Sequence, residues 1–255
     1  MITGAANGIG RRIAIDISVS TKLLVLIDDD QGSSLEQVAE CCRENGAKCI
    51  TLKIDVTSGQ ELKNGLEFAL TGATKIDIVF AFAGIAEVQY AHPNDVGRRI
   101  MDVNFFGVVN TIEIFIGTNS STSTLPMPAK IVSASSIGGL VSTHNSGFYS
   151  GSKAALTKYV DSIRLSTLQS NTEIHDIVLG FVRTRMILGR KHAERFAITD
   201  SRASTLILKC INKRRKRIHS IPKIRNIPWW VCSIMPHTFR IRILESIFKF
   251  FYKKK

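Results

Sequence analysis

A tyrosine and a lysine four residues apart carry the chemistry that is easiest to name in this chain. Tyr149 and Lys153 would lie one helical turn apart and project from the same face. A phenol titrates near pH 10, about three units too high for a base at neutral pH, and a neighbouring ammonium lowers that pKa. Ser136, 13 residues before Tyr149, can donate a hydrogen bond to an oxygen on which charge develops. Together these residues predict proton transfer at an alcohol or carbonyl oxygen.

A glycine-rich turn opens the same sequence, at Thr3-Gly4-Ala5-Ala6-Asn7-Gly8-Ile9-Gly10. Glycines at this spacing let the backbone turn tightly, approach a pyrophosphate and pack a helix against a sheet, with the helix dipole facing the anion. Taken alone, such a turn is more often an ordinary loop. Here a helical pattern follows it and a strand that ends in an acid comes next, so we interpret it as a dinucleotide site.

That acid is Asp28, which closes an apolar run and lies 18 residues after Gly10. A carboxylate at this place fits the ribose hydroxyls of an adenosine and would repel a 2′-phosphate. The sequence therefore favours NAD, while Arg11 and Arg12 keep NADP open. A simple turn residue after a strand is the alternative reading of Asp28.

The elements that must position these residues follow from the alternation of apolar runs with amphipathic stretches, which indicates a parallel sheet covered by helices. We predict an α/β fold, a Rossmann-type doubly wound parallel sheet flanked by helices. The expected strands are residues 22–28, 47–54, 76–83, 129–134, 173–179 and, at an edge, 217–221. The expected helices are residues 9–20, 33–45, 60–71, 94–116, 148–170 and 201–212, with a loop at 118–124.

The first strand is the weak point of this scheme. Only Met1 and Ile2 precede the glycine-rich turn, whereas a strand needs about five residues and the first strand of such a sheet lies in its middle. We therefore expect the first strand to be largely missing, through a late start of the chain or an unfilled central position. A chain of this kind should be poorly stable.

The basic charge is concentrated at one end of the chain. Of the net +13, residues 201–255 carry +14, from 15 lysines and arginines against one acid, and the other 200 residues carry −1. Across residues 223–255, basic side chains interleave with apolar and aromatic ones, which predicts an amphipathic helical tail at a membrane interface, beyond a domain of residues 1–222. A solvated basic face is the alternative. Nucleic-acid binding through the basic run at 213–217 is disfavoured, because no aromatic platform accompanies it.

Composition excludes several other classes of protein. The five cysteines form no C-x-x-C pair and are odd in number, so neither a disulfide framework nor a zinc site is indicated, and the six histidines lack metal-ligand spacing. No apolar run reaches the roughly 18 residues of a spanning helix, and no signal peptide is visible. We expect a cytoplasmic protein with a peripheral membrane contact.

The combination of T-G-x-x-x-G-x-G, a later Asn, a Ser and Y-x-x-x-K resembles the short-chain dehydrogenase/reductase family over roughly residues 2–200. The resemblance implies a seven-stranded parallel sheet, with Tyr149 as general acid/base and Lys153 lowering its pKa and holding the nicotinamide ribose. It also implies that Ser136 steadies the substrate oxygen and that Asn104 holds a proton-relay water. The cofactor contacts that it implies are Gly4, Asn7, Gly8, Ile9, Gly10, Asp28, Asp55, Val56, Ala83, Gly84, Tyr149, Lys153, Val182 and Thr184.

The sequence departs from the family pattern where that pattern braces the cofactor site. Ala81-Phe82-Ala83-Gly84 lacks the side-chain amides of the family's N-N-A-G, and Leu179-Gly180 replaces its P-G. The leading hypothesis is an NAD(P)-dependent oxidoreductase that interconverts a secondary alcohol and a ketone of a hydrophobic substrate, as a homo-oligomer paired through residues 94–116 and 148–170. The alternative is a degraded or truncated member that acts as a non-catalytic cofactor-binding or interaction protein.

Overall fold

The computed structural model describes residues 1–86, 93–117, 125–142, 146–212 and 218–252. The expected loop at 118–124 and the basic run at 213–217 lie outside the described residues, as do the last three lysines.

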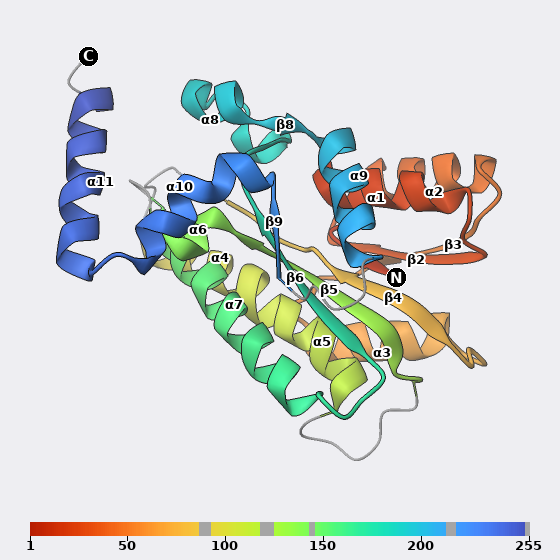
Figure 1. The fold of residues 1–255 in the computed structure, drawn as a ribbon. Coiled ribbons are helices and arrows are strands. Elements are labelled where there is room, and N and C mark those ends of the chain that lie inside the picture. The colour runs from red at the N-terminus through yellow and green to blue at the C-terminus, as the bar shows by residue number, and fades with distance from the viewer. Residues whose placement is uncertain (87–92, 118–124, 143–145, 213–217, 253–255) are drawn as a thin grey trace.

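Seven parallel strands form one sheet in the order β3-β2-β1-β4-β5-β6-β9 (Figure 1). The doubly wound parallel sheet that the sequence predicts is therefore confirmed. The strands are β1 Ile2–Thr3, β2 Leu23–Asp28, β3 Lys48–Lys53, β4 Ile76–Ala81, β5 Pro128–Ser136, β6 Glu173–Leu179 and β9 Ile218–Ile221. Two short strands, β7 Val182–Arg183 and β8 Ile198–Thr199, pair separately. Each strand expected from the sequence is present, with β5 continuing two residues further, to Ser136.

The first strand is as short as the sequence predicts. β1 holds two residues and lies in the middle of the sheet, where Ile2 is in register with Leu26 on one side and Phe80 on the other. The hydroxyl oxygen of Thr3 accepts hydrogen bonds from the backbone N–H groups of Phe82 (3.1 Å) and Ala83 (3.3 Å). Thr3 therefore braces the segment after β4, which has no side-chain amide of its own.

Eleven α-helices of the described residues surround the sheet. Their bounds are α1 Gly8–Ser18, α2 Ser34–Glu44, α3 Gly59–Ala69, α4 Pro93–Met101, α5 Val108–Ile116, α6 Ile137–Leu140, α7 Gly147–Ser166, α8 Lys191–Phe196, α9 Asp200–Ile211, α10 Lys223–Ile234 and α11 His237–Tyr252. Helices α1, α2 and α9 cover one face, and α3, α5 and α7 cover the other (Figure 1).

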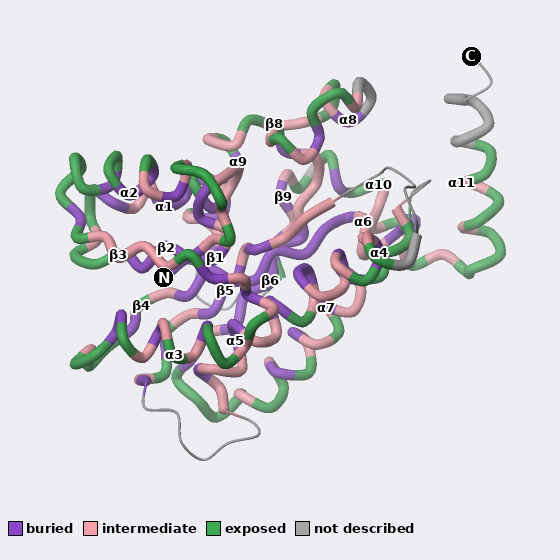
Figure 2. The backbone as a smooth tube through the Cα atoms, turned by 180° about the vertical axis from the view of Figure 1, so that it is seen from behind, coloured by how far each residue is buried: buried purple, intermediate pink, exposed green. Residues whose placement is uncertain are grey.

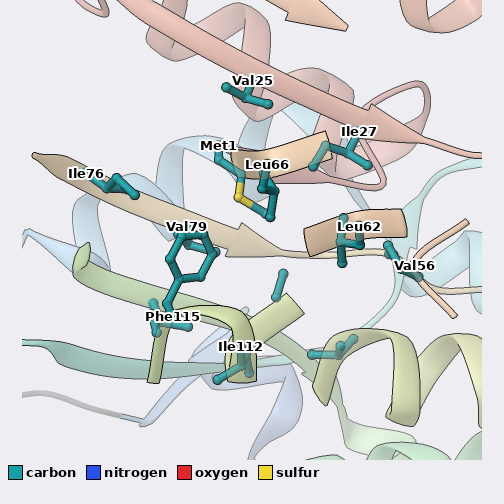
Figure 3. Close-up of a cluster of buried hydrophobic side chains, with 14 of the residues drawn as sticks. Met1, Val25, Ile27, Val56, Leu62, Leu66, Ile76, Val79, Ile112 and Phe115 are labelled. Atoms are coloured by element: carbon teal, nitrogen blue, oxygen red, sulfur yellow. The ribbon is translucent and has the colours of Figure 1, made fainter. Parts of the chain in front are cut away.

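The core has two layers because successive side chains of a strand point to opposite faces of the sheet. In β2, Leu24 and Leu26 pack with the layer of α1, α2 and α9, whereas Val25 and Ile27 pack with the layer of α3, α5 and α7. Figure 3 shows Val25 and Ile27 within the second layer. Burial is concentrated in the central strands (Figure 2), as expected of a parallel sheet covered on both faces.

The helix expected at 94–116 is interrupted. Between α4 and α5 the backbone forms a π-helical segment, Asp102–Gly107, which contains Asn104. A Cβ on Gly107 would lie 2.4 Å from Cγ2 of Val56, so the helix packs closely against the chain after β3, and a larger residue would require Val56 to move. Helical periodicity alone does not distinguish a π turn from an α turn, so the prediction of one uninterrupted α-helix is wrong here.

The C-terminal residues form two helices with different surroundings. Helix α10 is joined to the sheet through Asn226, which is 1% exposed and donates to the carbonyl of Val178 (3.3 Å) and to Oγ of Ser220 (3.0 Å). Helix α11 stands apart from the sheet in both views (Figures 1 and 2). None of the described helices has the length and apolar character needed to cross a bilayer. The division of the chain at residue 222 stays a prediction.

Candidate active site

A cleft of about 650 Å³ opens where the parallel strands end, and its walls come from the segments after β1, β2, β3, β4, β5 and β6. In doubly wound sheets, ligands bind in the crevice beyond the carboxyl ends of the strands. With the exception of Asn104, every site residue predicted from the sequence lines this cleft. The structure thus brings together residues separated by as many as 180 positions.

The glycine-rich turn forms the floor of the cleft. Gly4 adopts a φ of +71°, and a Cβ on Gly10 would lie 2.1 Å from the carbonyl oxygen of Gly4, so no larger residue fits without moving the backbone. Helix α1 begins at Gly8, so the N-terminal amides of this helix lie beside Asn7 and Ile9, which also line the cleft. This closely packed turn fits the pyrophosphate of a nicotinamide dinucleotide, which needs close backbone approach and helix N–H donors.

Asp28 lies at the end of the cleft that is predicted to hold the adenosine, called the adenosine end below. Its Oδ2 accepts a hydrogen bond from the backbone N–H of Ala6 (2.9 Å), so the acid also holds the glycine-rich turn in place. Burial raises the pKa of Asp28, and the bond from Ala6 opposes that rise. A carboxylate has further lone pairs with which to accept ribose hydroxyls, so the geometry is compatible with the role predicted for Asp28.

An arginine that the sequence analysis missed ties this end together. Arg99 of α4 donates to Oδ2 of Asp55 (2.7 Å) and to Oδ2 of Asp29 (3.2 Å), and so links the segments after β2 and β3. Burial would raise the pKa of Asp55, but the bonds from the Thr57 N–H and from Arg99 outweigh it and lower the pKa. No motif identifies Arg99, because its partners lie 44 and 70 residues away in sequence.

Ser136 and Tyr149 meet at the opposite end. Ser136 ends β5, and its Oγ accepts a hydrogen bond from the N–H of Gly138 (3.1 Å) at the start of α6. Burial raises the pKa of the Tyr149 phenol, whereas a hydrogen bond with Ser136 and the charge of Arg190 lower it. The predicted serine–tyrosine pair is therefore in direct contact, and Arg190 is a neighbour that the sequence did not reveal.

Lys153 lies in the same wall, buried to 5% exposure. Its Nζ donates to the carbonyl of Ala134 (2.9 Å) and lies 3.4 Å from the point where a Cβ on Gly84 would be placed. Burial lowers the pKa of Lys153 to about 8, and the charge of Asp176 opposes that shift. In this structure the cation that lowers the pKa of Tyr149 is Arg190, so the effect expected from Lys153 stays a prediction.

Asp176 is a second residue that the sequence analysis missed. It lies in β6 with 1% exposure and accepts hydrogen bonds from the hydroxyls of Ser133 (3.0 Å) and Ser135 (2.9 Å). Burial raises the pKa of Asp176, and these hydroxyls together with Arg164 and Lys153 oppose the rise. An acid in the middle of a strand expected to be buried was the available signal, because a buried carboxylate requires partners.

Asn104 lies behind the cleft wall. Its Oδ1 accepts from the N–H of Ile85 (2.7 Å), and its Nδ2 donates to the carbonyl of Ile85 (2.9 Å) and to Oγ of Ser152 (3.2 Å). Asn104 therefore holds the segment after β4 against α7. The role of Asn104 in proton relay stays a prediction.

Comparison with known proteins agrees with this geometry. The family model described as short chain dehydrogenase matches residues 1–195. The chain is 26% identical over 194 residues to 11-beta-hydroxysteroid dehydrogenase 1A of Arabidopsis thaliana, covering 74% of this chain and 54% of that protein. It is 27% identical over 192 residues to cis-4-hydroxycyclohexanecarboxylate dehydrogenase of Sinomonas cyclohexanicum, covering 74% of this chain and 75% of that protein.

A solved structure shows the same fold. The short-chain dehydrogenase/reductase of Burkholderia phymatum in complex with NAD aligns with a TM-score of 0.75 and 21% identity, over 90% of each chain. Because the family model covers residues 1–195 of the 255, the chain belongs to the short-chain dehydrogenase family, whose members are oxidoreductases with a nicotinamide cofactor.

Proposed function

We propose that the protein interconverts a secondary alcohol and a ketone and prefers NAD to NADP. The observation that carries this proposal is the shared cleft, in which Ser136 and Tyr149 lie in contact at one end and Asp28 lies at the other. Asp28 supports the preference for NAD because its charge disfavours a 2′-phosphate.

When it is bound, the nicotinamide supplies or accepts the hydride. In reduction, the Tyr149 phenol gives its proton to the ketone oxygen. In oxidation, the phenolate oxygen of Tyr149 takes the proton from the alcohol. Ser136 donates a hydrogen bond to that substrate oxygen. Because Ser136 Oγ accepts from the Gly138 N–H, its own hydrogen remains available for the substrate when Tyr149 turns to its proton transfer.

Lys153 has the burial expected of a group that assists this proton transfer. With a pKa lowered to about 8, its ammonium can both hold ribose hydroxyls as a donor and give up a proton near neutral pH. The ionisation of Asp176 favours the ammonium form, because the two groups lie within electrostatic reach of one another. The proposed machinery thus consists of Ser136, Tyr149 and Lys153 at the cleft surface, with Asp176 beneath them.

We also propose that the C-terminal helices bring a hydrophobic substrate from an anionic membrane surface. Large apolar side chains are exposed on α10 and α11, namely Ile227, Val231, Ile234, Phe239 and Ile241. Arg240 and Arg242 lie among them, as in helices that bind at bilayer interfaces. Flotation with anionic liposomes tests this, and a full-length chain that does not float with them would contradict it.

The helices that pair in the expected homo-oligomer expose apolar side chains as well. Phe106 is 52% exposed, Phe148 49% and Leu165 69%. Exposed apolar side chains of this size favour burial against a second copy of the chain, which supports a dimer or larger assembly. Sedimentation of Leu165→Lys tests the interface, since a charge there should shift the wild-type assembly towards monomer.

The decisive experiment on the reaction is the Tyr149→Phe variant. Loss of the general acid/base should lower kcat by about 10²- to 10⁴-fold, and NADH binding, followed by fluorescence, should weaken far less than kcat falls, because phenylalanine keeps the ring. Tyr159→Phe is the matched control, because Tyr159 lies on the same helix but outside the cleft, with its hydroxyl bonded to Glu113 (2.6 Å). NADH formation is followed with a panel of secondary alcohols.

Undiminished turnover by Tyr149→Phe would remove the proposed acid/base. If the wild-type chain binds NADH but oxidises none of the alcohols, the non-catalytic alternative is favoured instead.

A further inference from the structure

Arg190 gives the substrate end of the cleft a cation. It stands at the start of α8, in the segment that follows β6, and lines the same cleft as Ser136 and Tyr149. Its charge acts on the Tyr149 phenol, and the phenol in turn acts on the guanidinium. The guanidinium and the Tyr149 phenol, at which proton transfer is proposed, therefore lie within electrostatic reach of one another, at the end of the cleft opposite to Asp28.

Arg190 has no acidic partner within the part of the chain that the structure describes. Among the described residues, no carboxylate forms an ion pair with Arg190, and Tyr149 is the one ionisable group whose charge acts on it. The acid on its own helix, Glu194, accepts a hydrogen bond from the N–H of Gly189 (2.7 Å). A partly buried guanidinium that lines a cleft without a counter-ion is a site for an anion, because an anionic ligand would compensate for the lost hydration.

Apolar side chains and a second arginine line the cleft with Arg190. Ile137, Met186 and Ile187 offer hydrocarbon contacts, and the second arginine is Arg185. Arg190 differs from Arg185 in that its charge acts on the Tyr149 phenol. A ligand that fits has an apolar body that carries the reacting carbon and an anionic group at its other end. A carboxylate matches the planar donors of a guanidinium in a bidentate pair.

We propose that Arg190 binds a carboxylate of the substrate, and that the physiological substrate is a hydroxy acid or oxo acid with an apolar body. The inference rests on the proposed function, since it places the reacting oxygen at Tyr149. It adds that the carboxylate lies on the far side of that oxygen from the cofactor, and that Arg190 is the residue that selects acids over neutral alcohols.

The test measures binding rather than turnover. Cyclohexanecarboxylate and the straight-chain acids from butyrate to octanoate are titrated into the protein with NADH bound, each beside its own primary amide, by calorimetry. We expect at least one acid to bind at least tenfold more tightly than its amide. In Arg190→Gln this preference should fall to less than twofold, and in Arg190→Lys it should be intermediate, because lysine keeps the charge but loses the fork of donors.

Arg195→Gln is the matched control. Arg195 is exposed on the same helix and lies outside the cleft, so this variant removes the same charge and should retain the full preference for acids. Equal binding of acids and amides by the wild-type protein, or a preference that survives in Arg190→Gln, would overturn the proposal. So would a tenfold weaker binding of NADH by Arg190→Gln, which would assign the guanidinium to a cofactor phosphate.

These outcomes separate the substrate class from the reaction. A protein that oxidises neutral secondary alcohols through Tyr149 and shows no preference for acids keeps the proposed function and loses the role of Arg190. A protein that prefers acids through Arg190 but transfers no hydride keeps the anion site and loses the proposed function.

Discussion

The two ends of the cleft are built in different ways. The adenosine end is formed where β1, β2 and β3 stop, so Gly4, Asp28 and Asp55 are placed directly by the sheet. The substrate end depends on α7 and on the irregular segment between β6 and α9, which carries Arg190. Residues placed by strand ends can be predicted from spacing along the chain, whereas residues placed by a loop need the three-dimensional structure.

The adenosine end should respond most strongly to a single methyl group. In Gly10→Ala the added Cβ would meet the carbonyl oxygen of Gly4 at 2.1 Å, so the backbone of the turn must move. We expect NADH to bind at least 100-fold more weakly. The free energy of unfolding should fall by about 3 kcal/mol, as for an overpacked site. Fluorescence titration and urea unfolding measure the two effects.

Gly151→Ala is the control for this variant. Gly151 lies in α7, two residues after Tyr149, and a Cβ there would meet nothing within 4 Å. Alanine favours a helix over glycine by up to about 1 kcal/mol, so this variant should be as stable as wild type or more so. Equal NADH affinities of the Gly10 and Gly151 variants would show that the turn tolerates a side chain, and the contrast between the two ends would then fail.

The residues at the adenosine end could be predicted from the sequence because they lie close together along the chain. The glycine-rich turn, α1 and β2 follow one another along the chain, so spacing from Gly10 to Asp28 fixes their relation in space. The same holds for Tyr149 and Lys153, which share one helix. Ser136 was proposed from its chemistry and its spacing to Tyr149, whereas the pair Asp55-Val56 was found only through the resemblance to a family, because its spacing alone does not bring it to the cleft.

The residues that escaped prediction depend on contacts between distant segments. Asp176 lies in a strand predicted as buried, and only its register with Ser133 and the neighbouring strand shows that hydroxyls satisfy it. Arg99 lies in a helix that was predicted, but its ion pairs with Asp29 and Asp55 depend on how that helix packs. The π-helical segment around Asn104 was missed because an α-helix and a π-helix share the same apolar pattern over so few residues.

At the substrate end, burial of Lys153 should make the free energy of unfolding depend on pH. Folding lowers the pKa of Lys153 from 10.5 to about 8, so between these values the unfolded chain holds more protons than the folded one. The free energy of unfolding should therefore rise with pH from about 8 to 10.5, and below pH 8 the cost of burying the ammonium is present in full. The shift corresponds to about 3 kcal/mol.

Lys153→Met removes this contribution, so the wild-type chain should gain up to about 3 kcal/mol of stability relative to the variant between pH 8 and 10.5. The lost hydrogen bond to Ala134 adds a difference that does not change with pH. Urea unfolding of both proteins at pH 7, 8, 9 and 10 measures the slope. Lys158→Met, an exposed lysine on the same helix, should run parallel to wild type. A stability difference between wild type and Lys153→Met that stays flat with pH would mean that the ammonium is solvated.

The smallest expected effect concerns the choice of cofactor at the adenosine end. Asp28→Ser removes the charge that disfavours a 2′-phosphate and keeps a short polar side chain. We expect the ratio of the dissociation constants for NADPH and NADH to fall by about tenfold, a difference of about 1.4 kcal/mol. Fluorescence titration with both dinucleotides measures it.

Two further measurements test whether the effect of Asp28→Ser is confined to the choice of dinucleotide. Asp77→Asn removes an acid that is 74% exposed and lies outside the cleft, so its ratio should equal that of wild type. Because Ala6 loses its acceptor in Asp28→Ser, both dinucleotides should also bind somewhat more weakly, and the ratio rather than either constant reports the charge. The preference of the NADH complex for acids over amides should not change, since Arg190 lies at the opposite end. A ratio that stays at the wild-type value would assign Asp28 to the turn alone and leave the selection between dinucleotides to other residues.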